Sequence, residues 1–263
     1  IIADAIGNAV DQALPNLANF SMLEAWMCAL GYTFQLYFDF SGYSDMAIGL
    51  GKMFNFTFPE NFNSPYKSRS ITDFWRRWHI SLSTWFRDYV YIPLGGNRTS
   101  VSRNYLNVLI VFVISGLWHG ANWTFIIWGA LHGFYQVIYL RLKRIRTKFN
   151  LNIPILNTLF VYGLVTFAWI FFRANNISEA WEYISKLAEL DFTFNLVQIS
   201  AQKGPLNLFI SIIVIGLLFV SYRLPKNLKF QTESKEIVFL IVTLLTIFTL
   251  GINGESQFIY FQF

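Results

Sequence analysis

The three histidines of the chain, His79, His119 and His132, are the side chains best suited to acid–base chemistry. A neutral imidazole titrates near physiological pH and is the usual general base for activating a hydroxyl. His119 is the strongest candidate, because Gly116 and Gly120 flank it and allow other groups to approach its backbone. The spacing alone is equally typical of a structural histidine, but an ionisable residue in an apolar segment favours a functional role.

His79 is the second candidate and His132 is expected to be a packed helix histidine. Trp118 and Trp123 are expected to form a wall of low dielectric constant around His119. Three histidines so spaced give weak support for a metal site, and no HExxH motif is present, so we expect no metal. The sequence also lacks a GxSxG elbow, a Walker loop and a GxGxxG motif, which disfavours serine hydrolases and nucleotide-binding proteins.

Composition places these residues in a membrane protein. Of 263 residues, 54% are hydrophobic, 19% are aromatic and only 13% are charged, about half the charged share of a soluble domain. The net charge of +5 comes from basic residues beside apolar runs, which the positive-inside rule explains without nucleic acid. The single cysteine, Cys28, cannot form an intrachain disulfide and is expected to be a small buried hydrophobe.

Apolar runs over 124–140, 154–172, 206–222 and 237–253 predict membrane spans. The positive-inside rule then places 141–153 and 223–236 in the cytoplasm, with 173–205 and the C-terminus outside.

Residues 105–118 form a shorter run of about 21 Å as a helix. Residues 105–140 are therefore predicted to form a re-entrant hairpin whose tip, residues 118–123, ends inside the membrane.

Two further segments shape the predicted site. Residues 20–50 are apolar but contain Asp39 and Asp45, whose carboxylates should face protein or water and not lipid. Residues 51–103 are polar and basic, and Thr72 and Asp73 are predicted to cap a helix that runs to about Tyr91. An aromatic face and a basic face are typical of an amphipathic helix lying in the membrane interface. The predicted aromatic face consists of Trp75, His79, Leu82 and Phe86, and the basic face of Arg76, Ser83 and Arg87.

Four stretches together resemble one family. They are residues 37–47 (YFDFSGYSDMA), 61–66 (NFNSPY) with 74–83 (FWRRWHISLS), 88–98 (DYVYIPLGGNR) and 116–123 (GLWHGANW), with the closing residues 258–263 in agreement. In these motifs the chain resembles the membrane-bound O-acyltransferases (MBOAT) of the alginate O-acetyltransferase type.

The resemblance implies an all-α, polytopic transmembrane fold and an acyltransferase in the bacterial inner membrane. The chain, which has no initiating Met and no signal peptide, is expected to be one membrane-embedded domain (1–263), the C-terminal part of a longer protein. The implied donor is acetyl-CoA or another acyl thioester, with no bound cofactor. The implied acceptor is an extracytoplasmic polysaccharide such as alginate, reached through an exported acetyltransferase partner.

The motifs assign site residues by position. The resemblance makes His119 the catalytic histidine and His79 the second polar position, which orients the donor or stabilises charge on the oxygen. Trp78, Trp118 and Asn122 are expected to contact substrate. A covalent acyl-His119 intermediate is an alternative to direct transfer.

Rival interpretations are D-alanyl transfer to teichoic acid, peptidoglycan O-acetylation and a non-enzymatic transporter. The absence of an internal repeat counts against the transporter.

Overall fold

The protein is all-helical over the residues that its computed structural model describes, 2–148, 153–191 and 241. The α-helices are α1 (Ile2–Ala13), α2 (Met22–Met53), α3 (Ile71–Trp75), α4 (Ile80–Phe86), α5 (Val101–His119), α6 (Trp123–Lys148), α7 (Pro154–Arg173) and α8 (Ile177–Ala188). Two 3-10 turns, Leu14–Asn19 and Pro65–Lys67, and a π-helical turn, Arg87–Tyr91, connect them.

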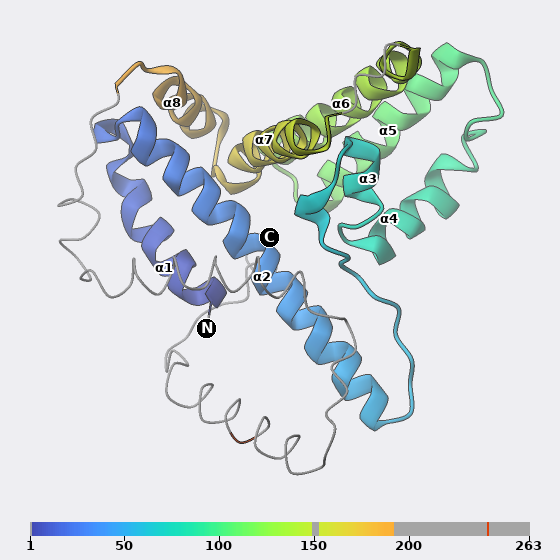
Figure 1. The fold of residues 1–263 in the computed structure, drawn as a ribbon, viewed down its shortest axis with the longest axis horizontal. Helices are drawn as coiled ribbons and strands as arrows, with labels where there is room; N and C mark the ends of the chain where they lie inside the picture. The colour runs from blue at the N-terminus through green and yellow to red at the C-terminus, as the bar shows by residue number, and fades with distance from the viewer. Residues whose placement is uncertain (1, 149–152, 192–240, 242–263) are drawn as a thin grey trace.

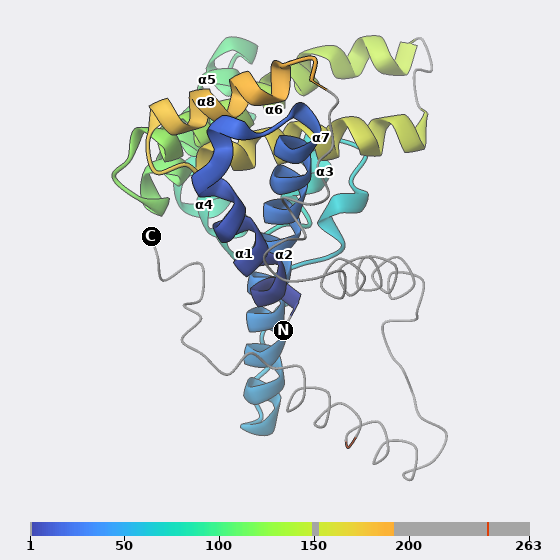
Figure 2. The ribbon, with the colours of Figure 1, turned by 90° about the vertical axis from the view of Figure 1, so that its left-hand side faces the viewer.

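The long helix α2 lies on one side of the molecule with α1 and α8, and the α5–α6 pair lies on the other (Figure 1). The α1 and α8 helices lie against the N-terminal half of α2, and α7 contacts both α2 and α6. The C-terminal half of α2 extends beyond α1 (Figure 2). The helix begins with a capping box, in which Ser21 Oγ accepts from the Glu24 N–H and the Glu24 carboxylate accepts from the Ser21 N–H, satisfying two N–H groups at the helix end.

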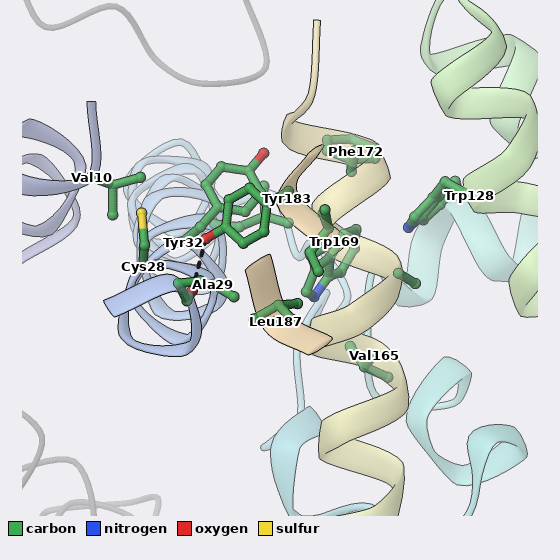
Figure 3. Close-up of a cluster of buried hydrophobic side chains, with 14 of the residues drawn as sticks. Val10, Cys28, Ala29, Tyr32, Trp128, Val165, Trp169, Phe172, Tyr183 and Leu187 are labelled. Atoms are coloured by element: carbon green, nitrogen blue, oxygen red, sulfur yellow. Dashed lines mark hydrogen bonds between the residues drawn. The ribbon is translucent and has the colours of Figure 1, made fainter. Parts of the chain in front are cut away.

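Buried aromatic rings join the two sides of the molecule. Trp169 of α7 packs on Trp128 of α6 with ring centroids 5.6 Å apart, and on Trp78 with centroids 5.2 Å apart. All three indoles are almost completely buried. Figure 3 shows Trp128, Trp169 and Phe172 in one cluster with Tyr32 and Cys28 of α2. Cys28 is buried and unbridged, as the sequence predicts.

The α5 and α6 helices form an antiparallel hairpin whose turn is residues 120–122 (Figure 1). Two glycines make the contact close. A methyl group at Gly116 would collide with the carbonyl oxygen of Phe125, and one at Gly129 with that of Phe112. Small residues of this kind let two helix backbones approach each other.

The predicted length of the first hairpin helix was wrong. Ser100 caps α5, which has 19 residues and is about 28 Å long at 1.5 Å per residue. The apolar run stops short because the first turn contains polar residues, Ser102 to Asn104. A helix of this length can cross the membrane, so the shortness that suggested a re-entrant tip is not a property of the structure.

The predicted continuous helix over 72–91 was also wrong. Ser70, not Thr72 or Asp73, caps α3, which ends at Trp75. The chain then turns through His79, whose φ of 45° and ψ of 57° are left-handed, before α4 begins. Trp75 and His79 therefore do not share one helix face.

Other predicted segments agree with the observed helices. The run 154–172 matches α7, and the run 124–140 lies within α6. Among the described residues, α5 and α7 are long and apolar enough to cross a membrane. The predicted apolar segment 20–50 falls almost entirely within the unbroken helix α2 (Met22–Met53), on which Asp39 is half-buried and Asp45 is exposed. The run 206–222 lies outside the described residues, and of the run 237–253 only residue 241 is described.

Candidate active site

His119 occupies the last position of α5 and is enclosed by aromatic rings of α6 and α7. Its ring centroid lies 5.1 Å from Trp128 and 5.1 Å from Phe172, both in edge-to-face geometry. Only 7% of the residue is exposed. An imidazole in such an apolar enclosure is held in one place and interacts strongly with any polar group that reaches it.

The expected tryptophan wall around His119 is different in the structure. Trp118 does contact the imidazole, with centroids 4.9 Å apart, but 57% of it is exposed. Trp123 is 67% exposed, because it begins α6 on the outside of the turn. The enclosing walls are instead Trp128 and Phe172, which helical periodicity alone does not identify as neighbours of His119.

His79 lies in the left-handed turn between α3 and α4, beside α2. Its ring meets Phe40 of α2 edge-on at 4.6 Å and lies 6.5 Å from Phe62. Burial lowers the pKa of His79 to about 4, because the charged form loses hydration. The imidazole is therefore neutral at physiological pH.

Asn61 contacts His79 and is a polar neighbour that the sequence did not single out. Its side-chain oxygen lies 3.3 Å from His79 Nδ1, and its carbonyl oxygen accepts from the Ile80 N–H at 2.9 Å. Asn61 belongs to the quoted NFNSPY motif. That position was the available signal, but spacing along the chain does not reveal that the motif meets residues 79–81.

His79 and His119 both lie at the edge of the buried aromatic cluster. They come from different elements, and buried aromatic rings connect them. Trp78, next to His79, packs on Trp169, which stacks on Trp128, the ring that contacts His119. A continuous set of buried tryptophan rings thus links the surroundings of the two candidate histidines.

His132 is a fully buried residue of α6. Its Nδ1 accepts a hydrogen bond from the Trp75 indole N–H at 3.3 Å, and its ring lies 5.1 Å from that of Trp128. This matches the expected packed helix histidine. The Trp128 ring contacts both His132 and His119.

The remaining predicted site residues have structural contacts. The Asn122 amide donates to the Asn175 carbonyl oxygen at 2.8 Å, and its oxygen accepts from the Thr124 N–H at 3.1 Å. Asn122 thereby caps α6 and ties the hairpin turn to the segment before α8. Trp78 is 2% exposed and packs in the core. No group of three or more potential metal ligands occurs in the described part of the chain.

Helices of membrane-spanning length around a histidine pair define a class: helical membrane proteins with a candidate acid–base site. Comparison with known proteins identifies the family within this class. Residues 4–177 match the model of MBOAT, the membrane-bound O-acyltransferase family. Because this match covers more than half of the 263 residues, the chain belongs to the membrane-bound O-acyltransferase family.

Several curated relatives are similar over most of this chain. It is 52% identical over 195 residues to the probable alginate O-acetylase AlgI of Azotobacter vinelandii, covering 74% of this chain and 38% of that protein. It is 47% identical over 192 residues to the peptidoglycan O-acetyltransferase of Helicobacter pylori, covering 73% and 36%.

A more distant relative has a different printed activity. The chain is 35% identical over 159 residues to the teichoic acid D-alanyltransferase of Bacillus subtilis, covering 57% of this chain and 40% of that protein. The chain thus spans less than half the length of the curated relatives it matches.

Proposed function

We propose that this chain is part of an O-acyltransferase that moves an acyl group, acetyl in the first instance, from a thioester donor toward the hydroxyls of an extracytoplasmic glycan. One observation carries the proposal: in a chain of the membrane-bound O-acyltransferase family, the histidine of the Trp-His-Gly motif, His119, is buried between the rings of Trp128 and Phe172. Acid–base histidines and a dry surrounding are what hydroxyl activation requires.

His119 acts as the general base in this proposal. It accepts the proton of the acceptor hydroxyl while the hydroxyl oxygen attacks the thioester carbonyl carbon. A C–O bond forms, the C–S bond breaks, and the leaving thiolate takes the proton back from the imidazolium. Trp128 and Phe172 keep the imidazole in position and limit water around it. Transfer through an acyl-His119 intermediate is the alternative, in which the acyl group is carried in two steps.

The other predicted site residues bind or position the substrates around His119 in this proposal. His79 is the second polar group at the substrates. Trp118, with its exposed ring against His119, contacts the substrate path. Trp78 and Asn122 affect substrate binding through the core packing and the hairpin turn that they hold.

The proposed setting is the bacterial inner membrane, in which the full protein crosses the bilayer several times. An acyl thioester such as acetyl-CoA supplies the acyl group from the cytoplasmic side. An exported or periplasmic acetyltransferase partner passes it to the polysaccharide. Lipid surrounds the protein, and no nucleic acid is involved. This arrangement follows the predicted distribution of basic loops and the relatives' printed activities.

The acceptor is proposed to be alginate or a similar polysaccharide, on the strength of the 52% identity to the probable alginate O-acetylase. Peptidoglycan is the second candidate, because the peptidoglycan O-acetyltransferase is 47% identical. Both acceptors are glycans that offer hydroxyls outside the cytoplasm. D-alanyl transfer has weaker support, from a relative at 35% identity.

The test uses full-length protein in membranes with radiolabelled acetyl-CoA and, in parallel, a D-alanyl carrier protein as donor. Label is followed into alginate, peptidoglycan and a co-expressed exported partner. Transfer of acetyl to one glycan supports the proposal and identifies the acceptor. Transfer of D-alanine alone would show that the donor is the D-alanyl carrier protein and not acetyl-CoA. Solute flux without acyl transfer from either donor would show that the protein is a transporter and not an enzyme.

A further inference from the structure

Asn61 binds the turn that carries His79 through both its main chain and its side chain. Its carbonyl oxygen accepts from the Ile80 N–H at 2.9 Å. Its side-chain Oδ1 accepts from the Ser81 N–H at 3.1 Å and from the Ser81 hydroxyl at 2.9 Å. A backbone N–H can only donate. The atom facing Ser81 is therefore the amide oxygen, which fixes the orientation of the Asn61 amide.

This orientation determines where His79 carries its proton. His79 Nδ1 lies 3.3 Å from the same Asn61 oxygen, and two acceptors cannot share a hydrogen bond. Ser81 Oγ, whose hydrogen points to Asn61, lies 3.4 Å from Nδ1 and offers a second lone pair. Both neighbours thus favour hydrogen on Nδ1. In a neutral imidazole the other nitrogen, Nε2, then has the free lone pair.

Further contacts keep Asn61 and His79 in this arrangement. The Asn61 amide nitrogen donates to Ser44 Oγ of α2 at 3.3 Å, which ties the amide to a long helix. Phe40, also on α2, meets the His79 ring edge-on at 4.6 Å and limits its rotation. The left-handed backbone of His79 is uncommon for a residue other than glycine. Such conformations persist where surrounding contacts over-determine them, often at functional sites.

We propose that Asn61 is a positioning residue that holds His79 as the Nδ1–H tautomer, so that Nε2 presents a hydrogen-bond acceptor to an O–H or N–H group of a bound substrate. A neutral His79 in this form has no proton on Nε2 to donate to a developing oxyanion. Its task is then to orient a substrate donor group, and charge on the thioester oxygen is stabilised elsewhere. The substrate role rests on the proposed acyl transfer, whereas the tautomer does not.

The tautomer is tested directly by nitrogen-15 NMR of full-length protein in lipid, labelled at histidine and measured at neutral pH. The His79→Gln variant assigns the His79 signals. We expect a protonated Nδ1 and an unprotonated Nε2 in the wild type. Asn61→Asp should keep this pattern, because a carboxylate oxygen also accepts, and Asn61→Leu should lose it. A wild-type His79 protonated at Nε2 would overturn the proposal whatever the protein's activity.

Transfer kinetics separate positioning from folding. We expect Asn61→Leu to lower kcat by roughly 10- to 100-fold, part of the ~10²–10⁴-fold that acid–base groups contribute, with KM little changed. Asn61→Asp should recover most of kcat. Asn63→Leu is the matched control in the same motif, because Asn63 contacts Arg77 through its main chain, and it should retain kcat.

The two measurements have separable outcomes. Asn61→Asp as slow as Asn61→Leu, in protein as stable as the wild type, would refute a positioning role. An inactive wild type with the expected Nδ1–H signal would refute the proposed acyl transfer and leave the tautomer established. If Asn61→Leu does not fold, the wild-type spectrum and the Asn61→Asp turnover still decide the proposal.

Discussion

Replacing Gly129 by alanine should push α5 and α6 apart and displace His119. A Cβ at Gly129 would collide with the Phe112 carbonyl oxygen and lie 3.2 Å from the Gly116 nitrogen. Both atoms belong to the α5 backbone and cannot rotate away as a side chain can. Overpacking of this kind destabilises by about 1–3 kcal/mol. Relief requires a separation of roughly 1 Å, a misplacement that can lower a catalysed rate by about 10²-fold.

Gly163→Ala on α7 is the matched control, because a Cβ there meets nothing within 4 Å. Alanine is favoured over glycine in a helix interior by about 0.5–1 kcal/mol. Gly163→Ala should therefore stabilise the protein, whereas Gly129→Ala should destabilise it. The assay is unfolding in one detergent together with acyl transfer in membranes, for both variants and the wild type. A Gly129→Ala protein as stable and as active as Gly163→Ala would refute the close-packed hairpin as the support of His119.

Two further predictions concern the other histidines. The pKa of His79, lowered by burial to about 4 from about 6.5 in the unfolded chain, means that the unfolded state binds more protons between these values. The contribution of His79 to the free energy of unfolding is therefore full above pH 6.5 and is lost as the pH falls toward 4. The free energy of unfolding of the wild type should fall more than that of His79→Gln between pH 7.5 and 4.5. Equal losses in the two proteins would contradict this prediction. His132→Leu should cost about 1–3 kcal/mol by leaving the Trp75 indole N–H without its acceptor, measured by thermal unfolding, and an unchanged midpoint would show that this hydrogen bond does not matter.

Hydrophobic runs predict the positions of the long helices well, because the apolar residues of each segment determine whether it is buried or in contact with lipid. The run 154–172 and the observed α7 (Pro154–Arg173) agree within one residue at the C-terminal end. The start of α5 is missed because Ser100 caps a first turn of polar residues, which hydropathy does not count. In such cases a cap, and not apolarity, determines where the helix begins.

The break at His79 is not predictable from periodicity. Residues 72–91 have a helical pattern, yet the chain turns at His79 because Asn61, distant in sequence, binds Ile80 and Ser81. Tertiary hydrogen bonds overrule local preference there. The same reason explains the site: the motifs identify His79 and His119, but only the packing of α2, α6 and α7 identifies Asn61, Trp128 and Phe172 as their neighbours.

The central claim, that His119 is the base for acyl transfer, is tested most directly with full-length wild type and His119→Ala in membranes. Both proteins receive radiolabelled acetyl-CoA and the exported partner, at matched expression and with unfolding curves recorded. The account predicts label transfer by the wild type and a loss of about 10²–10⁴-fold in the variant. Full transfer by a folded His119→Ala protein would contradict the account.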